Sequence, residues 1–246
     1  MVSTPLDPNV KWKKNEGAKT DAPYKALLGC LQYLTLVSRP DITFAVSVFS
    51  RFQDSPEESH WTGLKRIVRY IQGTQCFPLV YRRKDDEDPL VGYTDADFAS
   101  DEDERKSVSG HVFMVYGNVV SWSTKRQEIV SLSTTEAELI ALCNGSKEGI
   151  WLSTLLGEIG VLAVPFTIFE DNIPCIRIAE EPREHKRTKH IDVKYMFIRE
   201  LVKQKKINLK YVPTDSQLAD IFTKPLPKQK FQEMLNYLKM KIEGKC

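Results

Sequence analysis

Two aspartates stand where the end of an apolar run could present a carboxylate for chemistry. Asp95 follows the run 90–94, and Asp171 follows the run 166–170. Both runs have the composition of strands, and an acid directly after a strand projects into the crevice that open sheets use for ligands. The sequence therefore predicts two carboxylates at one edge of a sheet.

Two further acids lie in segments with helical spacing. Glu138 has apolar or small residues at the first, third and fourth positions after it, which places it beside the buried stripe of a helix. Asp220 likewise adjoins the apolar positions of a second expected helix. Glu136 is predicted to be a solvated acid of the first helical turn, where negative charge favours the helix N-terminus.

Taken singly, each of these acids is more often a cap, a turn former or a solvated charge. Their joint placement favours convergence on one point, and clustered carboxylates repel one another unless cations hold them. Hard oxygen ligands of this kind suit Mg²⁺ or Mn²⁺ rather than zinc. The candidate metal ligands are Asp95, Glu138, Asp171 and Asp220.

The elements that must position these acids change in kind near residue 77. Before it, residues 21–76 have helical apolar spacing interrupted by prolines, after a leader over 1–20 that lacks periodicity. After it, strands and helices alternate, which indicates an α/β fold with a mixed sheet and helices packed on its faces. Strands are expected over 77–82, 90–94, 109–116, 119–123, 165–170 and 207–212, three consecutive ones forming an antiparallel meander, and helices over 134–159, 174–179, 193–203, 215–223 and 229–240.

Composition limits the class of protein without choosing a function. The chain has 246 residues, 41% hydrophobic and 28% charged, and a net charge of +2, as in ordinary globular proteins of one large or two small domains. Basic clusters over 185–190 and 224–245 allow nucleic-acid binding without requiring it.

The cysteines and the apolar stretches bear on location. Five cysteines without a CxxC pair favour reduced thiols. No stretch approaches the roughly 20 apolar residues of a membrane helix, and residues 1–16 are too polar for a secretory signal. These features predict an intracellular protein, either cytoplasmic or nuclear, without a membrane partner.

The four acids belong to segments that resemble known motifs. The acidic segments, taken in order, resemble the four acidic motifs of ribonuclease H: Tyr93–Asp95, Thr135–Leu139, Glu170–Asn172 and Leu218–Asp220. The surrounding segments resemble the C-terminal part of copia-type retrotransposon Pol polyproteins, at Asp103–Gly110, Ser121–Gln127, Thr188–Tyr195 and Gln217–Pro227. Two earlier segments resemble the region that precedes it, Tyr24–Leu31 and Ser38–Asp41.

This resemblance implies both a fold and an activity. The fold is a ribonuclease H-like mixed five-stranded sheet flanked by helices over 77–225, with a thumb- or connection-like segment of reverse transcriptase over 21–76 and a helix and tail over 226–246. The activity is hydrolysis of the RNA strand of RNA–DNA hybrids, with Asp95, Glu138, Asp171 and Asp220 as the catalytic set. Two Mg²⁺ ions, or Mn²⁺ in their place, would serve as cofactors.

The resemblance also implies partners, and the sequence departs from the family at one point. The partners are the RNA–DNA hybrid and the remainder of the reverse transcriptase. Many ribonucleases H place a histidine in the loop before the fourth acid, whereas this loop is 212–216 and contains none. No Tyr-x-Asp-Asp motif is present, which excludes DNA synthesis by this piece on the family interpretation.

Several alternatives stay open at this stage. Candidate phosphate contacts, which could equally form a solvated face, are Lys125, Arg126, Lys186, Arg187 and Lys189. A zinc site of Cys175, His185 and His190 lacks a fourth ligand at a usual spacing. The main rival function is a catalytically silent module that keeps the fold as a binding or interaction surface. A second rival is a subdomain whose nuclease depends on an absent polymerase palm.

Overall fold

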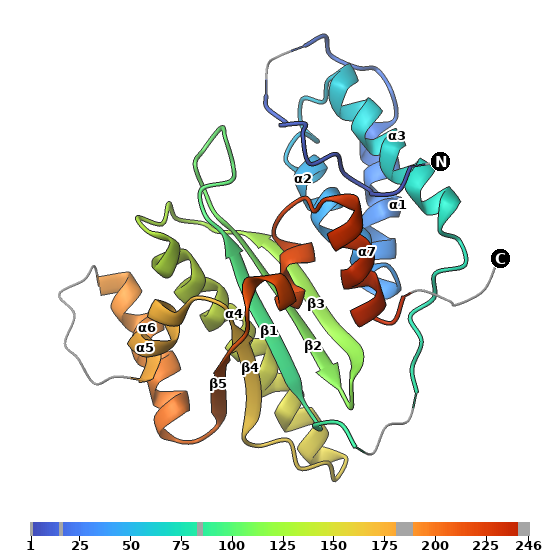
Figure 1. Cartoon of the computed structure of the whole chain (residues 1–246). Coiled ribbons are helices and arrows are strands. Elements are labelled where there is room, and N and C mark those ends of the chain that lie inside the picture. Colours follow the sequence, from blue (N-terminus) through green and yellow to red (C-terminus); the bar gives the residue numbers. More distant parts are fainter. Residues whose placement is uncertain (1, 15–16, 83–85, 181–188, 241–246) are drawn as a thin grey trace. The chain divides into compact units, whose positions relative to one another are not determined.

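The computed structural model describes residues 2–14, 17–82, 86–180 and 189–240 (Figure 1). It divides into two compact units. The first contains Met1–Val80, Glu102–Glu104 and Lys224–Cys246, and the second contains Tyr81–Asp101 and Arg105–Thr223. The domain boundaries expected from the sequence, after residues 20, 76 and 225, stay predictions.

A five-stranded mixed sheet organises the second unit. Its strands are β1 (Val91–Asp97), β2 (Val108–Val115), β3 (Asn118–Arg126), β4 (Phe166–Glu170) and β5 (Ile207–Tyr211), in the order β3-β2-β1-β4-β5. The first three form the expected antiparallel meander, and β4 and β5 extend it as parallel strands. This is the ribonuclease H-like α/β sheet that the sequence predicted.

A tight turn joins β2 to β3. Val115 pairs with Asn118, so the two-residue loop is Tyr116 and Gly117, with φ angles of 46° and 64°. Positive φ at both positions is the geometry of a type I′ turn, whose twist matches that of the flanking strands.

The helices of the second unit cover one face of the sheet. They are α4 (Thr134–Glu158), α5 (Ile173–Glu180) and α6 (Lys189–Lys203), and Figure 1 shows α4 running across the sheet with α5 and α6 beside it. The core between them and the strands is apolar and includes Phe113, Leu139, Leu142, Ile168 and Ile198. A helix therefore lies close beneath the strands that carry the aspartates.

Two expected elements differ in the structure. The strand predicted over 77–82 does not form; Pro78 lacks the N–H that a ladder needs, and Arg82 N donates to the Asn118 side chain instead, at 2.8 Å. The helix predicted over 215–223 is replaced by two short 3₁₀ segments, η2 (Thr214–Ser216) and η3 (Leu218–Phe222). Gln217 between them has an extended backbone. Its side chain accepts a hydrogen bond from Ala219 N and donates one to Thr94 O on β1.

The first unit is helical, as the sequence predicted for its N-terminal part. It contains α1 (Tyr24–Val37), η1 (Pro40–Ile42), α2 (Thr43–Ser50), α3 (Glu58–Gly73) and α7 (Lys228–Tyr237). Buried side chains at its centre include Leu28, Leu31, Phe49, Leu64 and Ile67. Within the predicted leader, Leu6 is buried and the Trp12 ring meets the Phe49 ring edge-on at 4.8 Å.

Two observations concern the helices and the cysteines. Within the described part of the chain, no helix is both long and apolar enough to cross a bilayer. Cys30, Cys143 and Cys175 are free thiols, but Cys76 is disulfide-bonded. The expectation of reduced thiols throughout is therefore wrong at Cys76, because pairing depends on which cysteines the fold brings together and not on their spacing.

Candidate functional site

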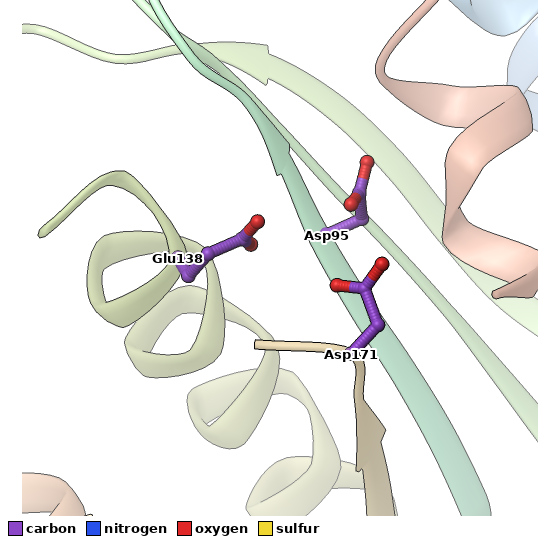
Figure 2. Close-up of side chains that lie close together, drawn as sticks. All are labelled: Asp95, Glu138 and Asp171. Carbon is purple, nitrogen blue, oxygen red and sulfur yellow. The ribbon is translucent and has the colours of Figure 1, made fainter. Parts of the chain in front are cut away.

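Three of the predicted acids come together at one edge of the sheet. Asp95 lies near the end of β1, Asp171 follows β4 directly, and Glu138 lies in the second turn of α4. One carboxylate oxygen from each lies within 4.8 Å of the others. Figure 2 shows the three side chains close together, each coming from a separate element. Asp95 and Glu138 are buried, while Asp171 is partly exposed and gives the group an open side.

Strand pairing explains why the two aspartates meet. β1 and β4 are parallel neighbours, and Tyr93 pairs with Phe169. Asp95 and Asp171 each lie two residues further along, so they reach the same edge at the same height. Parallel strands bring their carboxyl ends together in this way, which makes that edge the usual ligand site of such sheets.

The start of α4 places the third acid. Ser133 caps the helix by accepting a hydrogen bond from Glu136 N at 3.1 Å, and the Glu136 carboxylate accepts one from Leu132 N at 2.9 Å. These two hydrogen bonds fix the first turn, and Glu138 follows it. Glu136 is buried, so the prediction that it is solvated is wrong: its carboxylate folds back onto the backbone before the helix.

Close contact between α4 and β1 fixes the distance of Glu138 from the sheet. A Cβ atom at Gly145 would lie 2.4 Å from Cγ2 of Thr94, and one at Gly149 would lie 2.4 Å from the Phe166 ring. Only glycine permits this approach, since real Cβ atoms essentially never come so near another heavy atom.

Asp220 is the fourth predicted acid, and it lies in η3. It is buried but does not belong to the group of three among the described residues. Its segment is nevertheless fastened to β1: Gln217 Nε2 donates to Thr94 O at 2.9 Å, and the Thr223 hydroxyl donates to the Asp95 carboxylate. The structure thus brings the Asp220 segment to the site and leaves its carboxylate outside the group of three.

The segment η3 packs on the sheet face opposite α4. Gly110 pairs with Asp95, and a Cβ there would lie 2.7 Å from Thr223 Cγ2 and 2.8 Å from Phe222 Cβ. Thr94, the neighbour of Asp95, faces α4 instead. Because successive strand residues point to opposite faces, α4 and η3 enclose this part of β1 from both sides.

Sequence reasoning missed a fifth acid, Glu170, which it treated as the last residue of an apolar strand. Glu170 is fully buried, and burial raises the pKa of its carboxyl well above the usual range, with the charges of Asp95 and Asp171 acting in the same direction. Hydrogen bonds from Thr94 and from Asn172 N oppose this rise. The signal available in the sequence was a charged residue at the end of an otherwise uncharged strand run.

A thiol lies in the same acidic surroundings. Burial, and next the charges of Glu170, Glu138 and Asp171, raise the pKa of Cys175 well above its usual range. A thiol held in the protonated form is a poor nucleophile and a poor metal ligand. The partners that a zinc site would need, His185 and His190, lie outside the side chains that the structure describes.

The predicted phosphate contacts have mixed outcomes. Lys125 is exposed, and its Nζ lies 3.2 Å from the Glu128 carboxylate. Arg126 donates to the buried Asp101 carboxylate at 2.7 Å, which holds the guanidinium near the loop between β1 and β2. The side chains of Lys186, Arg187 and Lys189 lie outside those described. A role for these residues in binding nucleic acid stays a prediction.

Comparison with known proteins identifies the family. No family model matches the chain. The Retrovirus-related Pol polyprotein from transposon TNT 1-94 of Nicotiana tabacum is 40% identical over 240 residues, covering 94% of this chain and 18% of that protein. The corresponding polyprotein from transposon RE1 of Arabidopsis thaliana is 39% identical over 234 residues, covering 94% of this chain and 16% of that protein. The chain belongs to the copia-type retrotransposon Pol polyproteins and spans less than a fifth of the length of these relatives.

The chain is also similar to a protein that is not named as a transposon polyprotein. The Secreted RxLR effector protein 161 of Plasmopara viticola is 44% identical over 133 residues, which cover 54% of this chain and 93% of the effector.

Two solved structures were found by comparison with this chain. A ribonuclease H1, LC11-RNase H1 in complex with RNA/DNA hybrid, is 15% identical and covers 55% of this chain and 93% of that protein, with a TM-score of 0.42. The foamy viral protease-reverse transcriptase in complex with RNA/DNA hybrid is 15% identical and covers 87% of this chain and 27% of that protein, with a TM-score of 0.48. The fold assignment itself comes from the strand order and register of this chain.

Proposed function

We propose that this chain carries a metal-dependent ribonuclease H that hydrolyses the RNA strand of RNA–DNA hybrids. The observation that carries the proposal is the convergence of Asp95, Glu138 and Asp171 at the edge of a ribonuclease H-like sheet. Membership in the Pol polyprotein family supports it, because the four acidic motifs lie in the part of the chain that these relatives share.

The group of three acids fits a hard divalent cation. Oxygens within 4.8 Å of one another from separate elements can share an ion, and carboxylates at that spacing repel one another without one. We propose Mg²⁺, with Mn²⁺ as a substitute, and a second ion ligated with the help of Asp220. When bound, such ions supply Lewis-acid activation of water and stabilisation of the leaving oxygen.

The residues of the chain divide the remaining work. Asp95, buried between α4 and η3, is held by the Thr223 hydroxyl and presents its carboxylate in one orientation. Asp171, which is partly exposed, would face an approaching phosphodiester. Lys125 is a candidate contact to a backbone phosphate, while discrimination of RNA from DNA would depend on the 2′-hydroxyls and the groove shape of the hybrid.

Cleavage of a defined substrate tests the proposal. The purified chain, incubated with Mg²⁺ or Mn²⁺, is expected to cut the labelled RNA strand of an RNA–DNA hybrid and to leave double-stranded DNA of the same sequence intact. A folded chain that binds the hybrid but cuts nothing with either ion would replace the enzyme by the rival function, a silent binding module.

Two wider expectations belong to the same proposal. The chain would act together with the remainder of a reverse transcriptase, in keeping with the much greater length of its relatives. It would do so inside the cell, in the cytoplasm or the nucleus. Cleavage only after addition of the remaining polymerase would support the second rival, a nuclease that depends on an absent palm.

A further inference from the structure

We infer that Glu170 is a positioning residue of the metal site, whose buried carboxyl group sets the spacing between Asp95 and Asp171. Its carboxyl group accepts hydrogen bonds from Thr94, the residue before Asp95, and from Asn172, the residue after Asp171. The inference rests on the proposed function, because it concerns the ion that these acids would hold.

Each oxygen of the Glu170 carboxyl group binds one of the two segments. Thr94 Oγ1 donates to Glu170 Oε2 at 2.9 Å, and Asn172 N donates to Glu170 Oε1 at 3.2 Å. Thr94 directly precedes Asp95 on β1, and Asn172 directly follows Asp171. A single rigid carboxyl plane thus joins the strand ends that carry the two aspartates.

Both partners of Glu170 are themselves fixed. The Thr94 carbonyl accepts the hydrogen bond from Gln217, and its methyl group fills the space that a side chain at Gly145 would need. Asn172 Oδ1 accepts from Cys175 N at 2.9 Å and so caps α5. Because Thr94 and Asn172 are each held by other contacts, hydrogen bonds from both to one carboxyl group restrict the distance between them.

The backbone of Glu170 adds a third connection. Its carbonyl accepts a hydrogen bond from Val212 N at 3.0 Å, where the chain leaves β5 on its way to η3. The residue therefore links β1, the end of β4 and the segment that leads toward Asp220.

Glu170 is placed to orient the metal ligands and not to bind the ion itself. Its side chain is fully buried, and both oxygens accept hydrogen bonds from protein groups. Among the described residues, the acids that could share an ion are Asp95, Glu138 and Asp171. A carboxyl group buried beside like charges costs free energy, which the two hydrogen bonds offset.

The test compares variants by Mn²⁺ affinity, measured calorimetrically without substrate, and by hybrid cleavage. Glu170→Ala and Thr94→Val each remove the bond between the strands and should weaken Mn²⁺ binding about tenfold, within the range found for groups that orient metal ligands. They should lower kcat with little change in KM for the hybrid. The double variant should be no weaker than Glu170→Ala, because both changes break the same connection.

Two further variants separate positioning from general stability. Glu170→Gln keeps an oxygen acceptor and similar volume, and it should recover most of the Mn²⁺ affinity. Ser153→Ala removes another buried hydrogen bond of the same unit, from Ser153 Oγ to Ala163 O at 3.0 Å. It should lower the unfolding temperature and leave Mn²⁺ affinity at the parental value.

The outcomes distinguish the inference from the proposed function. A parent that binds Mn²⁺ and cleaves, with Thr94→Val and Glu170→Ala of parental Mn²⁺ affinity, overturns the inference alone. A parent that neither binds Mn²⁺ nor cleaves overturns the proposed function and the inference with it. If Glu170→Ala does not fold, the Mn²⁺ affinity of the nearly isosteric Thr94→Val variant tests the inference instead.

Discussion

Asp41 of the first unit and the group of three acids of the second unit lie in opposite electrostatic surroundings. In the first, Asp41 receives hydrogen bonds from Arg39 Nε at 2.9 Å and Nη2 at 2.8 Å, and one from the Tyr70 hydroxyl at 2.7 Å. Arg39 also donates to Thr74 Oγ1 at 2.7 Å, which connects η1 to the end of α3. Burial and the nearby Asp41 charge raise the pKa of Tyr70 well above its usual range, so its hydroxyl stays a donor.

In the second unit, Asp95, Glu138 and Asp171 approach one another, and Glu170 lies beside two of them. A buried ion pair makes the fold depend on both partners, because removing one leaves an uncompensated charge, whereas like charges that meet inside a fold store repulsion that a cation can relieve. The comparison teaches that the neighbouring charge decides the role of a buried acid: Asp41 lies beside a cation and supports its unit, whereas Asp95 and Glu138 lie beside other acids and, under our proposal, serve chemistry.

The largest effect is expected from removing one charge of the acid group formed by Asp95, Glu138 and Asp171. Asp95→Asn keeps size and hydrogen-bonding capacity but removes a ligand charge, so cleavage of the hybrid should fall by more than about 100-fold, beyond the loss typical of a supporting group. Hybrid binding should persist, and the unfolding temperature without metal should stay the same or rise, because repulsion is relieved.

The matched control for Asp95→Asn is Glu136→Gln. The glutamine oxygen can still accept the hydrogen bond from Leu132 N, so activity should stay within a few-fold of the parent. Equal losses in the two variants would show that activity depends on the intact start of α4 and not on Asp95 as a ligand.

The next largest effect is expected from breaking the Arg39–Asp41 ion pair of the first unit. Arg39→Met leaves the Asp41 carboxylate buried without its cation and should destabilise that unit by about 3–5 kcal/mol. Urea unfolding can be followed by Trp12 and Trp61, which lie in this unit, after Trp122 and Trp151 are replaced by phenylalanine. An unchanged transition midpoint would contradict a stabilising role for the pair.

A smaller effect sharpens the role of close packing in holding Glu138. Gly145→Ala places a Cβ 2.4 Å from Thr94 Cγ2, so either α4 or β1 must shift. The cost should be about 1–3 kcal/mol of unfolding free energy, with weaker Mn²⁺ binding. Gly157→Ala, with nothing within 4 Å of the added Cβ in the same helix, should be neutral or stabilise by up to about 1 kcal/mol.

The smallest effect concerns a base in the second unit. Burial lowers the pKa of His111 below its usual 6.5, and the nearby Glu148 charge opposes this. As the pH falls below 6.5, the unfolded chain binds a proton before the folded chain does, so stability is lost down to the folded pKa. The loss is about 1.4 kcal/mol for each pH unit between the two pKa values. Unfolding curves of His111→Gln should lack this part of the acid dependence, and an unchanged dependence would assign it to other groups.

Several features could be predicted because they are written locally in the chain. The meander followed by parallel strands comes from alternation and turn residues, and α4 comes from its capping residues and apolar spacing. Asp95 and Asp171 could be placed at one edge because each follows a strand, and strand ends of parallel neighbours coincide. The resemblance to ribonuclease H motifs then named the acids that the fold brings together.

Other features were decided only when distant segments met. Glu136 and Glu138 lie two residues apart on the same helix, yet the first caps the helix and the second joins the acid group, because a hydrogen bond from Leu132 N holds one and the approach of β1 and β4 surrounds the other. Gln217 breaks the expected last helix by reaching a carbonyl on β1, which no local pattern contains.

The sequence by itself determined the five strands of the sheet, the family, and the three acids that gather at the site. Only the tertiary structure decided that Asp220 stands outside that group of three and that Glu170 lies within hydrogen-bonding reach of both strand ends. The physical reason is that propensity and periodicity act over a few residues, whereas burial and hydrogen-bond partners depend on segments more than 70 residues apart, as for Thr94 and Glu170, with a separation of 76.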